Sequence, residues 1–284
     1  MNNLFILAFK HFIEIIPFFV LTLLLSAFLA AIIPDNFFER IFKSSNPATV
    51  ILSSITASIT PICTCGMIPL ASKLKKKGIS EKVVIAFLTT GSSCNISALV
   101  LTSVLGIKIT LYRFLFSVLL GFITAYFFTW FSVPNKNTSA NDQNTHKKHS
   151  LLSRIKTEFF EMLLGFGPWI IVSVILASIA NLYITPEHLS NFTGAKNLFS
   201  PFFFSISALP FYFCAGSDIP ISKMLLEKGI GLGSILSFMA GAPAINITSF
   251  LLYQKWLGVR NSVIYLAISF LVCGILGIII NAML

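Results

Sequence analysis

Eight long apolar stretches follow one another along the 284 residues of the chain, and they constrain its fold more than any other feature. An apolar run of about 20 residues can cross the hydrocarbon core of a bilayer as a helix. With 56% hydrophobic and 11% charged residues, the composition argues against a soluble domain. The sequence therefore predicts an all-α polytopic membrane protein with spans at residues 12–33, 47–71, 82–105, 109–132, 162–184, 198–222, 229–253 and 260–283.

A polar stretch at 134–150 separates two halves that match at a constant offset of 151 residues. Between 61–100 and 212–251, ten of 40 positions are identical without a gap. The matches include residue types that a shared membrane composition does not explain: Cys63 with Cys214, Pro69 with Pro220, Gly78 with Gly229 and Asn95 with Asn246. We expect a duplication of four spans per half, and two such repeats would enter the membrane in parallel.

Three segments are expected along the chain: a first transmembrane repeat (1–133), a polar cytoplasmic linker with an interfacial helix (134–157) and a second repeat (158–284). Basic residues favour the cytoplasmic side of a membrane. With the N-terminus inside, thirteen Lys and Arg residues fall on the inner side and seven, including Arg113, on the outer side. Both termini are therefore predicted to be cytoplasmic, in the inner membrane of a bacterium. The net charge of +10 is not interpreted as nucleic-acid binding.

Helix-breaking residues recur at one depth of the predicted membrane. Cys63 and Ser93 each lie 15 residues from Gly78 in the basic turn 75–78, or about 22 Å along a helix, near the middle of a ~30 Å hydrocarbon core. Non-helical backbone is tolerated there only inside protein or beside a water-filled cavity. The predicted structural breaks are Pro61, Gly66, Pro69, Gly91, Gly216, Pro220 and Pro243.

Short helices that begin at these breaks would direct free N–H groups and positive dipole ends into one central space. Asn95 and Asn246 are placed either to cap two of these helices or to contact a substrate, and Ser93 is expected beside them. Asp218 is interpreted either as the N-cap of a further helix or as a proton-carrying carboxylate, because an intramembrane carboxylate is a candidate for function.

Thiols supply the chemical character of the predicted site. Cys63 and Cys65 flank one residue at a break, and Cys94 is expected to approach them from the partner helix. Thiolates bind soft metal ions, and the same softness suits trivalent arsenic. The candidate substrate-binding thiols are Cys63, Cys65, Cys94 and Cys214, with Cys63 and Cys65 also as metal ligands. Cys273 is expected to be an apolar filler of the last span.

The segment Thr60-Pro-Ile-Cys-Thr-Cys-Gly-Met-Ile-Pro69 resembles the signature of the bacterial predicted-permease family that includes the ArsP-type methylarsenite efflux permeases. In the second half, Phe238-Met-Ala-Gly-Ala-Pro-Ala-Ile-Asn246 is also similar to that family. The resemblance implies an inner-membrane permease of eight spans, which exports trivalent organoarsenicals in one branch and copper or zinc in another. Two features depart from the pattern: Gly91-Ser-Ser-Cys94 replaces a proline-containing break, and no Cys/His-rich tail is present.

These observations predict a secondary transporter rather than an enzyme, because no nucleotide-binding or catalytic motif is present. A small molecule or metalloid would bind between the halves, in contact with lipid but not with nucleic acid, and no cofactor is expected. Export of a soft thiophilic substrate such as a trivalent organoarsenical is the favoured function. A Cu/Zn efflux permease, a membrane thiol oxidoreductase and a channel are the alternatives, and the sequence does not indicate the oligomeric state.

Overall fold

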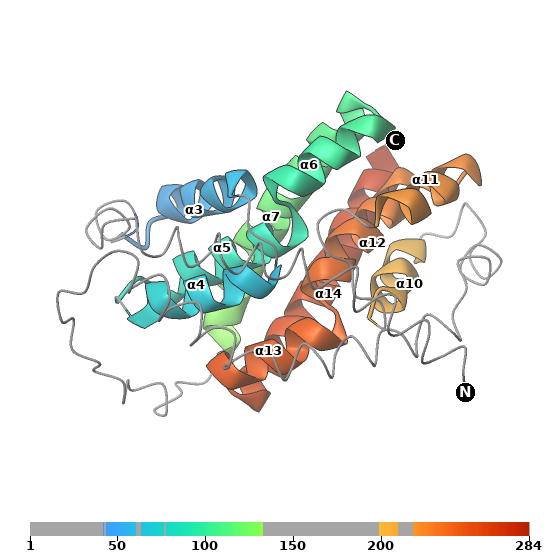
Figure 1. The fold of residues 1–284 in the computed structure, drawn as a ribbon. Helices are drawn as coiled ribbons and strands as arrows, with labels where there is room; N and C mark the ends of the chain where they lie inside the picture. The colour runs from blue at the N-terminus through green and yellow to red at the C-terminus, as the bar shows by residue number, and fades with distance from the viewer. Residues whose placement is uncertain are drawn as a thin grey trace, which may run out of the picture.

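A computed structural model describes residues 42, 44–60, 64–76, 78–132, 199–209 and 218–283, and every regular element in these ranges is a helix (Figure 1). The first half contributes α3 (Pro47–Ile59), α4 (Thr64–Lys76), α5 (Glu81–Ser93), α6 (Ile96–Thr102), the 3-10 helix η1 (Ser103–Leu105) and α7 (Ile107–Phe131). The second half contributes α10 (Ser200–Ser207), α11 (Ile219–Glu227), α12 (Leu232–Ala244), α13 (Ile247–Leu257) and α14 (Val259–Met283). The predicted all-α class is confirmed for these residues.

Three helical segments of the described part are long and apolar enough to cross a bilayer: Glu81–Leu105, Ile107–Phe131 and Val259–Met283. They coincide with three of the eight predicted spans, and the first of them is interrupted between α5 and α6. Two other predicted spans are each divided between shorter helices, 47–71 between α3 and α4 and 229–253 between α12 and α13. The predicted spans at 12–33 and 162–184, and the linker, lie outside the described residues.

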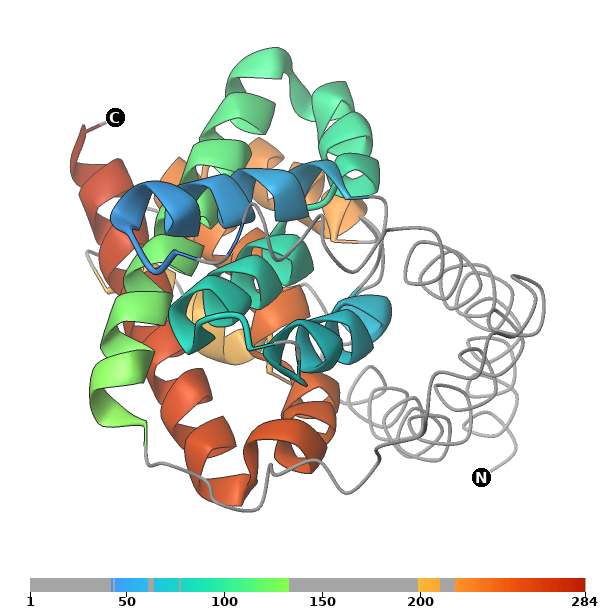
Figure 2. The ribbon, with the colours of Figure 1, turned by 90° about the vertical axis from the view of Figure 1, so that its left-hand side faces the viewer.

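The helices α5 and α12 form the centre of the molecule. Every α5 residue from Val83 to Ser93 is buried, and so is every α12 residue from Gly233 to Ala244. Figure 2 shows α3 lying over α5, where the Ser53 hydroxyl donates a hydrogen bond of 3.3 Å to the Val83 carbonyl. Small side chains let these helices approach closely, as is typical of helix packing in membranes.

The longest described helices, α7 and α14, have 25 residues each and pack side by side in opposite directions (Figure 1). In the first half of α7, Phe116 packs in one cluster with Val272 from the second half of α14. Near the end of α7, the Phe128 ring meets Tyr265 edge-on, close to the start of α14, with ring centroids 6.1 Å apart. The order of contacts is reversed between the two helices, so α7 and α14 are antiparallel.

The two helical hairpins α4–α5 and α11–α12 turn at opposite ends of this pair. Lys82, at the start of α5, lies with Nζ 4.9 Å from the ring centroid of Tyr126, near the end of α7. The Gly233 N–H, at the start of α12, donates a hydrogen bond of 2.7 Å to Asn281 Oδ1, near the end of α14. Because α7 and α14 end at opposite faces, the two turns also face opposite sides.

The predicted parallel relationship between the halves is therefore wrong. That prediction treated every apolar stretch as one full crossing, but 47–71 is divided into α3 and α4 of 13 residues each. A helix of that length spans about 20 Å, less than the hydrocarbon core. An apolar stretch that does not cross as one helix changes the number of crossings, and the antiparallel course of α7 and α14 shows that corresponding helices of the two halves run in opposite directions. The cytoplasmic side predicted for both the linker and the C-terminus stays a prediction, and the opposite ends of α7 and α14 do not favour it.

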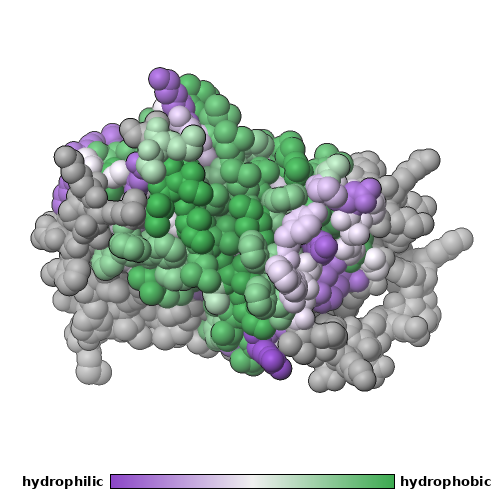
Figure 3. All heavy atoms as spheres, turned by 180° about the vertical axis from the view of Figure 1, so that it is seen from behind, coloured by the Kyte–Doolittle hydropathy of each residue, from purple (hydrophilic) through white to green (hydrophobic). Residues whose placement is uncertain are grey.

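A broad apolar surface with polar residues at its margins covers one face of the molecule (Figure 3). The large apolar side chains that α7 and α14 expose include Leu111, Leu115, Leu119, Phe127, Val263, Leu271, Ile275 and Ile279. Exposed apolar patches of this extent are not stable in water and mark a contact with membrane or protein. Their position on two helices of spanning length assigns this face to lipid acyl chains.

The close packing of α5 on α7 at Gly121 gives a test of the fold. A Cβ at Gly121 would run into Thr90 Oγ1 and lie 3.0 Å from the Ala86 carbonyl oxygen. Gly121→Ala should therefore destabilise the protein by about 1–3 kcal/mol through overpacking, measured as a lower melting temperature in detergent. Gly241→Ala is the matched control, since its nearest neighbour is 3.6 Å from the new Cβ. Equal melting temperatures for the two variants would contradict the packing.

The antiparallel arrangement predicts the side on which two reporters lie. Fusions of a reporter active only in the cytoplasm, and of one active only outside it, are made after Ser132 and after Met283. Because α7 and α14 end at opposite faces, the two fusion sites should give opposite reporter activities. Basic residues favour the cytoplasm, so the fusion after Ser132, on the side of Lys75 and Lys82, should be the cytoplasmic one. The same activity at both sites would refute the antiparallel arrangement.

Candidate functional site

Two interruptions of helical backbone lie in the interior, one in each half. The first separates α5 from α6 at Cys94–Asn95, and the second separates α12 from α13 at Ile245–Asn246. The first break touches the second half directly, because the Ser93 hydroxyl donates a hydrogen bond of 3.3 Å to the Ala240 carbonyl of α12. Interrupted helices at membrane depth are where transporters bind substrates and ions, so the surroundings of these breaks are the candidate functional site.

Each break is followed by an asparagine that caps the next helix. Asn95 Oδ1 accepts a hydrogen bond of 2.9 Å from the Ala98 N–H at the start of α6. Asn246 Oδ1 accepts one of 2.6 Å from the Ser249 N–H, and its Nδ2 donates 2.7 Å to the Ala242 carbonyl. Both side chains are buried. Capping therefore occupies these amides in the present conformation, and substrate contact by them stays a prediction.

The two interior breaks do not fall on Gly91 and Pro243, which were expected to cause them. Gly91 lies inside α5, where an added Cβ would collide with Met67, so its absent side chain serves the approach of α4. Pro243 lies inside the last turn of α12. The residues Gly66 and Pro69 lie inside α4, and Pro220 lies in the first turn of α11, where proline is compatible with a helix. Pro61 and Gly216 lie outside the described residues.

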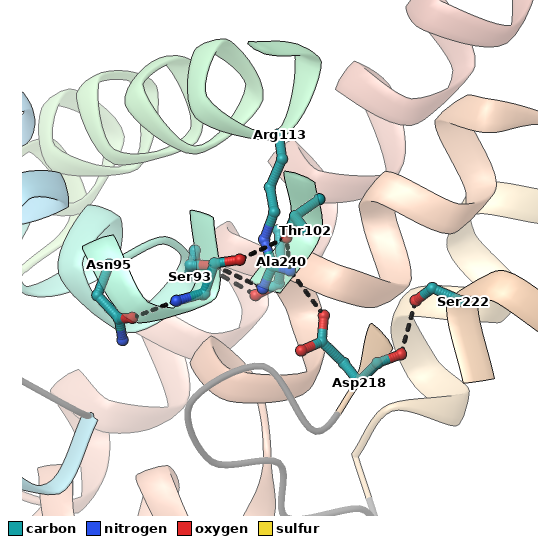
Figure 4. Close-up of polar contacts among 8 residues, drawn as sticks. Ser93, Asn95, Thr102, Arg113, Asp218, Ser222 and Ala240 are labelled. Atoms are coloured by element: carbon teal, nitrogen blue, oxygen red, sulfur yellow. Dashed lines mark hydrogen bonds and ion pairs between the residues drawn. The ribbon is translucent and has the colours of Figure 1, made fainter. Parts of the chain in front are cut away.

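A buried ion pair joins the two halves beside the first break (Figure 4). Arg113 Nη1 of α7 lies 3.0 Å from Asp218 Oδ2 at the start of α11, and each side chain is 2% exposed. Figure 4 shows the guanidinium where the end of α5, the helix α6 and the chain at Asp218 converge. Removing one member of such a pair leaves a charge without compensation in a poorly solvated site.

Arg113 also holds the backbone of the first break. Its Nη1 donates a hydrogen bond of 2.8 Å to Thr102 Oγ1 of α6, and its Nη2 donates one of 3.4 Å to the Ser93 carbonyl. Its Nε has no hydrogen-bond partner among the described residues. One side chain thus connects α6, the end of α5 and the second half of the molecule.

The prediction that Arg113 faces the outer side of the membrane is wrong. It rested on the expected start of a span at 109, near which a basic residue normally reaches the interface. The helix α7 instead begins at Ile107, and Arg113 lies almost two turns inside it, turned toward the interior. The signal that identifies such a residue is a charge within an apolar helix of spanning length.

Asp218 stands at the N-cap position of α11, but its side chain makes no capping hydrogen bond. Its backbone carbonyl instead accepts hydrogen bonds from the N–H and the hydroxyl of Ser222, at 3.0 and 2.8 Å. The carboxylate is directed at Arg113. The helix start therefore positions the acid without being capped by it, and the proton-carrying role stays a prediction.

A second polar contact between the halves involves Thr89 of α5, which precedes the first break. Thr89 Oγ1 and the Tyr265 hydroxyl are 3.0 Å apart, and the Tyr265 ring meets Tyr253 edge-on with centroids 4.9 Å apart. Both tyrosines are fully buried, and the Tyr253 hydroxyl has no hydrogen-bond partner within the described part of the chain. The sequence did not indicate this cluster, because Thr and Tyr are common in apolar helices and these residues belong to no motif.

The described thiols are buried in two different places. Cys94 lies at the first break, next to Ser93, and its N–H donates 2.8 Å to the Thr90 carbonyl. Cys273 lies within α14, and its Sγ donates 3.3 Å to the Ser237 carbonyl. Cys63 and Cys214 lie outside the described residues, as does the side chain of Cys65. Across the described residues, no three His, Cys, Asp or Glu side chains are grouped so that they could hold a metal ion.

The ion pair predicts a specific pattern of stability. Arg113→Gln and Asp218→Asn should each lower the free energy of unfolding by about 3–5 kcal/mol, because each leaves one buried charge unpaired. The double variant removes both charges and should recover most of that loss. Denaturation in detergent measures the difference. Glu81→Gln is the control, since the Lys75–Glu81 pair is 27% and 32% exposed and should contribute under about 1 kcal/mol. A double variant less stable than both single variants would contradict the pairing.

Comparison with known proteins gives the chain a family. The model of a family described as "Predicted permease", ArsP_1, matches residues 1–282. A UPF0718 protein of Methanocaldococcus jannaschii is 22% identical, with 92% of this chain and 91% of the relative covered. A UPF0718 protein of Bacillus subtilis is also 22% identical, over 98% of this chain and 95% of the relative.

A further relative, from Streptococcus mutans, is named a putative two-component membrane permease complex subunit and is 20% identical over 86% of this chain and 83% of its own length. No solved structure gives a significant match. The matches to membrane permeases agree with the apolar helices of spanning length and with the interrupted helices between them. The family model covers nearly the whole chain, and the protein therefore belongs to the ArsP_1 family of predicted permeases.

Proposed function

We propose that the chain is a secondary transporter that moves a small solute across the membrane by alternating exposure of one site between its two halves. The family and the apolar helices support a multi-pass membrane permease, a transporter rather than an enzyme. The observation that carries the proposal is the buried Arg113–Asp218 pair, which joins the halves beside an interrupted helix. Buried charges in membrane proteins mark the pathways of substrates and ions.

The halves are proposed to be repeats of inverted topology. α5 and α12 have 13 residues each and begin 151 residues apart, and each is followed by a break and a capping asparagine. α7 and α14 have 25 residues each and begin 152 residues apart, in opposite directions. Inverted repeats support alternating access, because exchanging the conformations of the two halves turns an inward-open form into an outward-open one. The division into 1–133, 134–157 and 158–284 follows from this proposal.

The substrate is proposed to be a soft, thiophilic small molecule such as a trivalent organoarsenical, exported across the inner membrane. Cys63, Cys65, Cys94 and Cys214 are the proposed ligands, with Ser93 beside them. The position of Cys94 supports this, because it lies at the break itself, next to the carbonyl that accepts from Arg113. Trivalent arsenic is thiophilic in the same sense as the soft metal ions that thiolates select.

The thiols give a direct test of the proposed substrate. Everted membrane vesicles that contain the protein should accumulate trivalent methylated arsenic, and Cys63→Ser/Cys65→Ser should reduce the rate at least about tenfold if each thiol contributes a bond to arsenic. Cys273→Ser is the control, because Cys273 lies within α14, where its thiol donates a hydrogen bond to the Ser237 carbonyl, and it is not among the proposed ligands. Unchanged transport in the double variant would exclude the thiol mechanism while leaving the permease.

The same vesicles separate the alternative functions. Accumulation of Cu(I) or Zn(II) in place of the arsenical would indicate the metal-efflux alternative. Reduction of quinone with a cycling disulfide and no accumulation would indicate a thiol oxidoreductase. Transport by native membranes but not by the purified, reconstituted chain would indicate a second subunit, as the name of the Streptococcus mutans relative suggests for that protein.

A further inference from the structure

We propose that Arg113 and Asp218 form an exchangeable ion pair, in which a small anionic group of the transported solute replaces the Asp218 carboxylate on Arg113 while Asp218 takes up one proton. This proposal rests on the proposed function as a transporter but not on the arsenical as its substrate, and it adds a substrate class and a coupling ion. The solute would carry a carboxylate or another monoanionic oxygen group. Its recognition would belong to Arg113 and would be separate from the thiols.

Electroneutrality of the interior is the first argument. Arginine stays protonated in proteins, so Arg113 requires a negative partner in every conformation that buries it. The titratable groups that face Asp218 among the described residues are Arg113 and the Cys94 thiol. The neighbouring helices α6, α10 and α12 contain no titratable residue. Lys223 and Glu227 on α11 itself, and Lys228 directly after it, are exposed. The described interior therefore offers Arg113 a single acidic partner.

The bonding of Arg113 is the second argument. A guanidinium has five N–H donors in a planar fork that matches two oxygens of one anion. Here Nη1 is bonded to Thr102 and paired with Asp218 through a single oxygen, and Nη2 makes a long contact of 3.4 Å with the Ser93 carbonyl. The Nε has no hydrogen-bond partner among the described residues. The guanidinium thus has donor capacity that Asp218 does not use and that a second anion can use.

The attachment of Asp218 is the third argument. Its carboxylate makes no capping hydrogen bond to α11, so it can leave Arg113 without uncapping the helix. It also belongs to the other half of the molecule from Arg113, so release of the contact frees the halves to move relative to each other. If the ion pair only stabilised the fold, the Asp218 carboxylate would gain further stability from a capping hydrogen bond to α11, which it does not make.

The exchange conserves charge and atoms. In the first state, Asp218 carboxylate and Arg113 guanidinium are paired, and the site is neutral. In the second, one proton from solution is bound to Asp218 as a carboxylic acid, the solute anion accepts the guanidinium N–H donors, and the site is again neutral. One proton therefore binds with each anion, and no buried charge is left unpaired in either state.

Anion binding to the purified full-length protein tests the proposal, with methanesulfonate and formate as probes because both stay monoanionic between pH 5 and 8. Stabilisation against thermal unfolding reports binding. Wild type should be stabilised more strongly at pH 5 than at pH 8, with an apparent affinity that changes by up to about tenfold per pH unit, as one linked proton requires. Asp218→Asn, which imitates the protonated acid, should bind the anions equally at both pH values.

The controls separate anion recognition from folding. Arg113→Gln/Asp218→Asn has no buried charge, should remain folded and should show no stabilisation by either anion. Glu81→Gln should behave as wild type, because Glu81 pairs with Lys75 at the surface. If Asp218→Asn showed no more stabilisation than the double variant, or if wild type bound the anions equally at pH 5 and pH 8, the proposal would be overturned. Arsenical transport that persists in that case leaves the proposed function intact.

Discussion

A permanent positive charge in an apolar interior is the constraint on which the rest of this structure depends. Arg113 lies within a helix of membrane-spanning length and is 2% exposed. Its guanidinium must find a counter-charge and acceptors inside the protein. It finds them on three separate elements, at Asp218, Thr102 and the Ser93 carbonyl. The charge therefore ties the interrupted α5–α6 segment of the first half to the start of α11 in the second.

The antiparallel course of α7 and α14 explains why the two halves meet there. Each helical hairpin enters from its own face, so the ends of α5 and α12 come together in the interior, where Ser93 is bonded to Ala240. At each break, Asn95 or Asn246 caps the helix that follows, so backbone N–H groups there have hydrogen-bond partners within the protein and need no water. A transporter needs this combination, because a site that opens in turn to each side must lie between parts that can move.

Much of this arrangement was predictable from the sequence, and the rest failed for identifiable physical reasons. The all-α class and the three long spans follow from apolar length, and the 151-residue offset reappears in the starts of α5 and α12. The prediction of parallel halves was wrong because the length of an apolar run does not show whether the segment crosses the membrane or turns back within it. Arg113 was missed because sequence position placed it near a span end, whereas burial depends on which face of the helix carries it. The first break was predicted at Gly91 but lies after it, because the missing side chain of Gly91 allows close packing of α4 on α5 and does not interrupt the helix.

Cross-linking between the halves tests the central claim, that they meet at the end of α5, most directly. Ser93→Cys and Ala240→Cys are introduced together into a chain whose five native cysteines are replaced by serine, with a protease site inserted into the polar stretch 134–150. The Ser93 hydroxyl and the Ala240 carbonyl are 3.3 Å apart, so a short bifunctional thiol reagent should join the pieces. After cleavage, the halves should run together at the mass of the intact chain. Halves that separate after treatment with the reagent, as they do without it, would contradict the account.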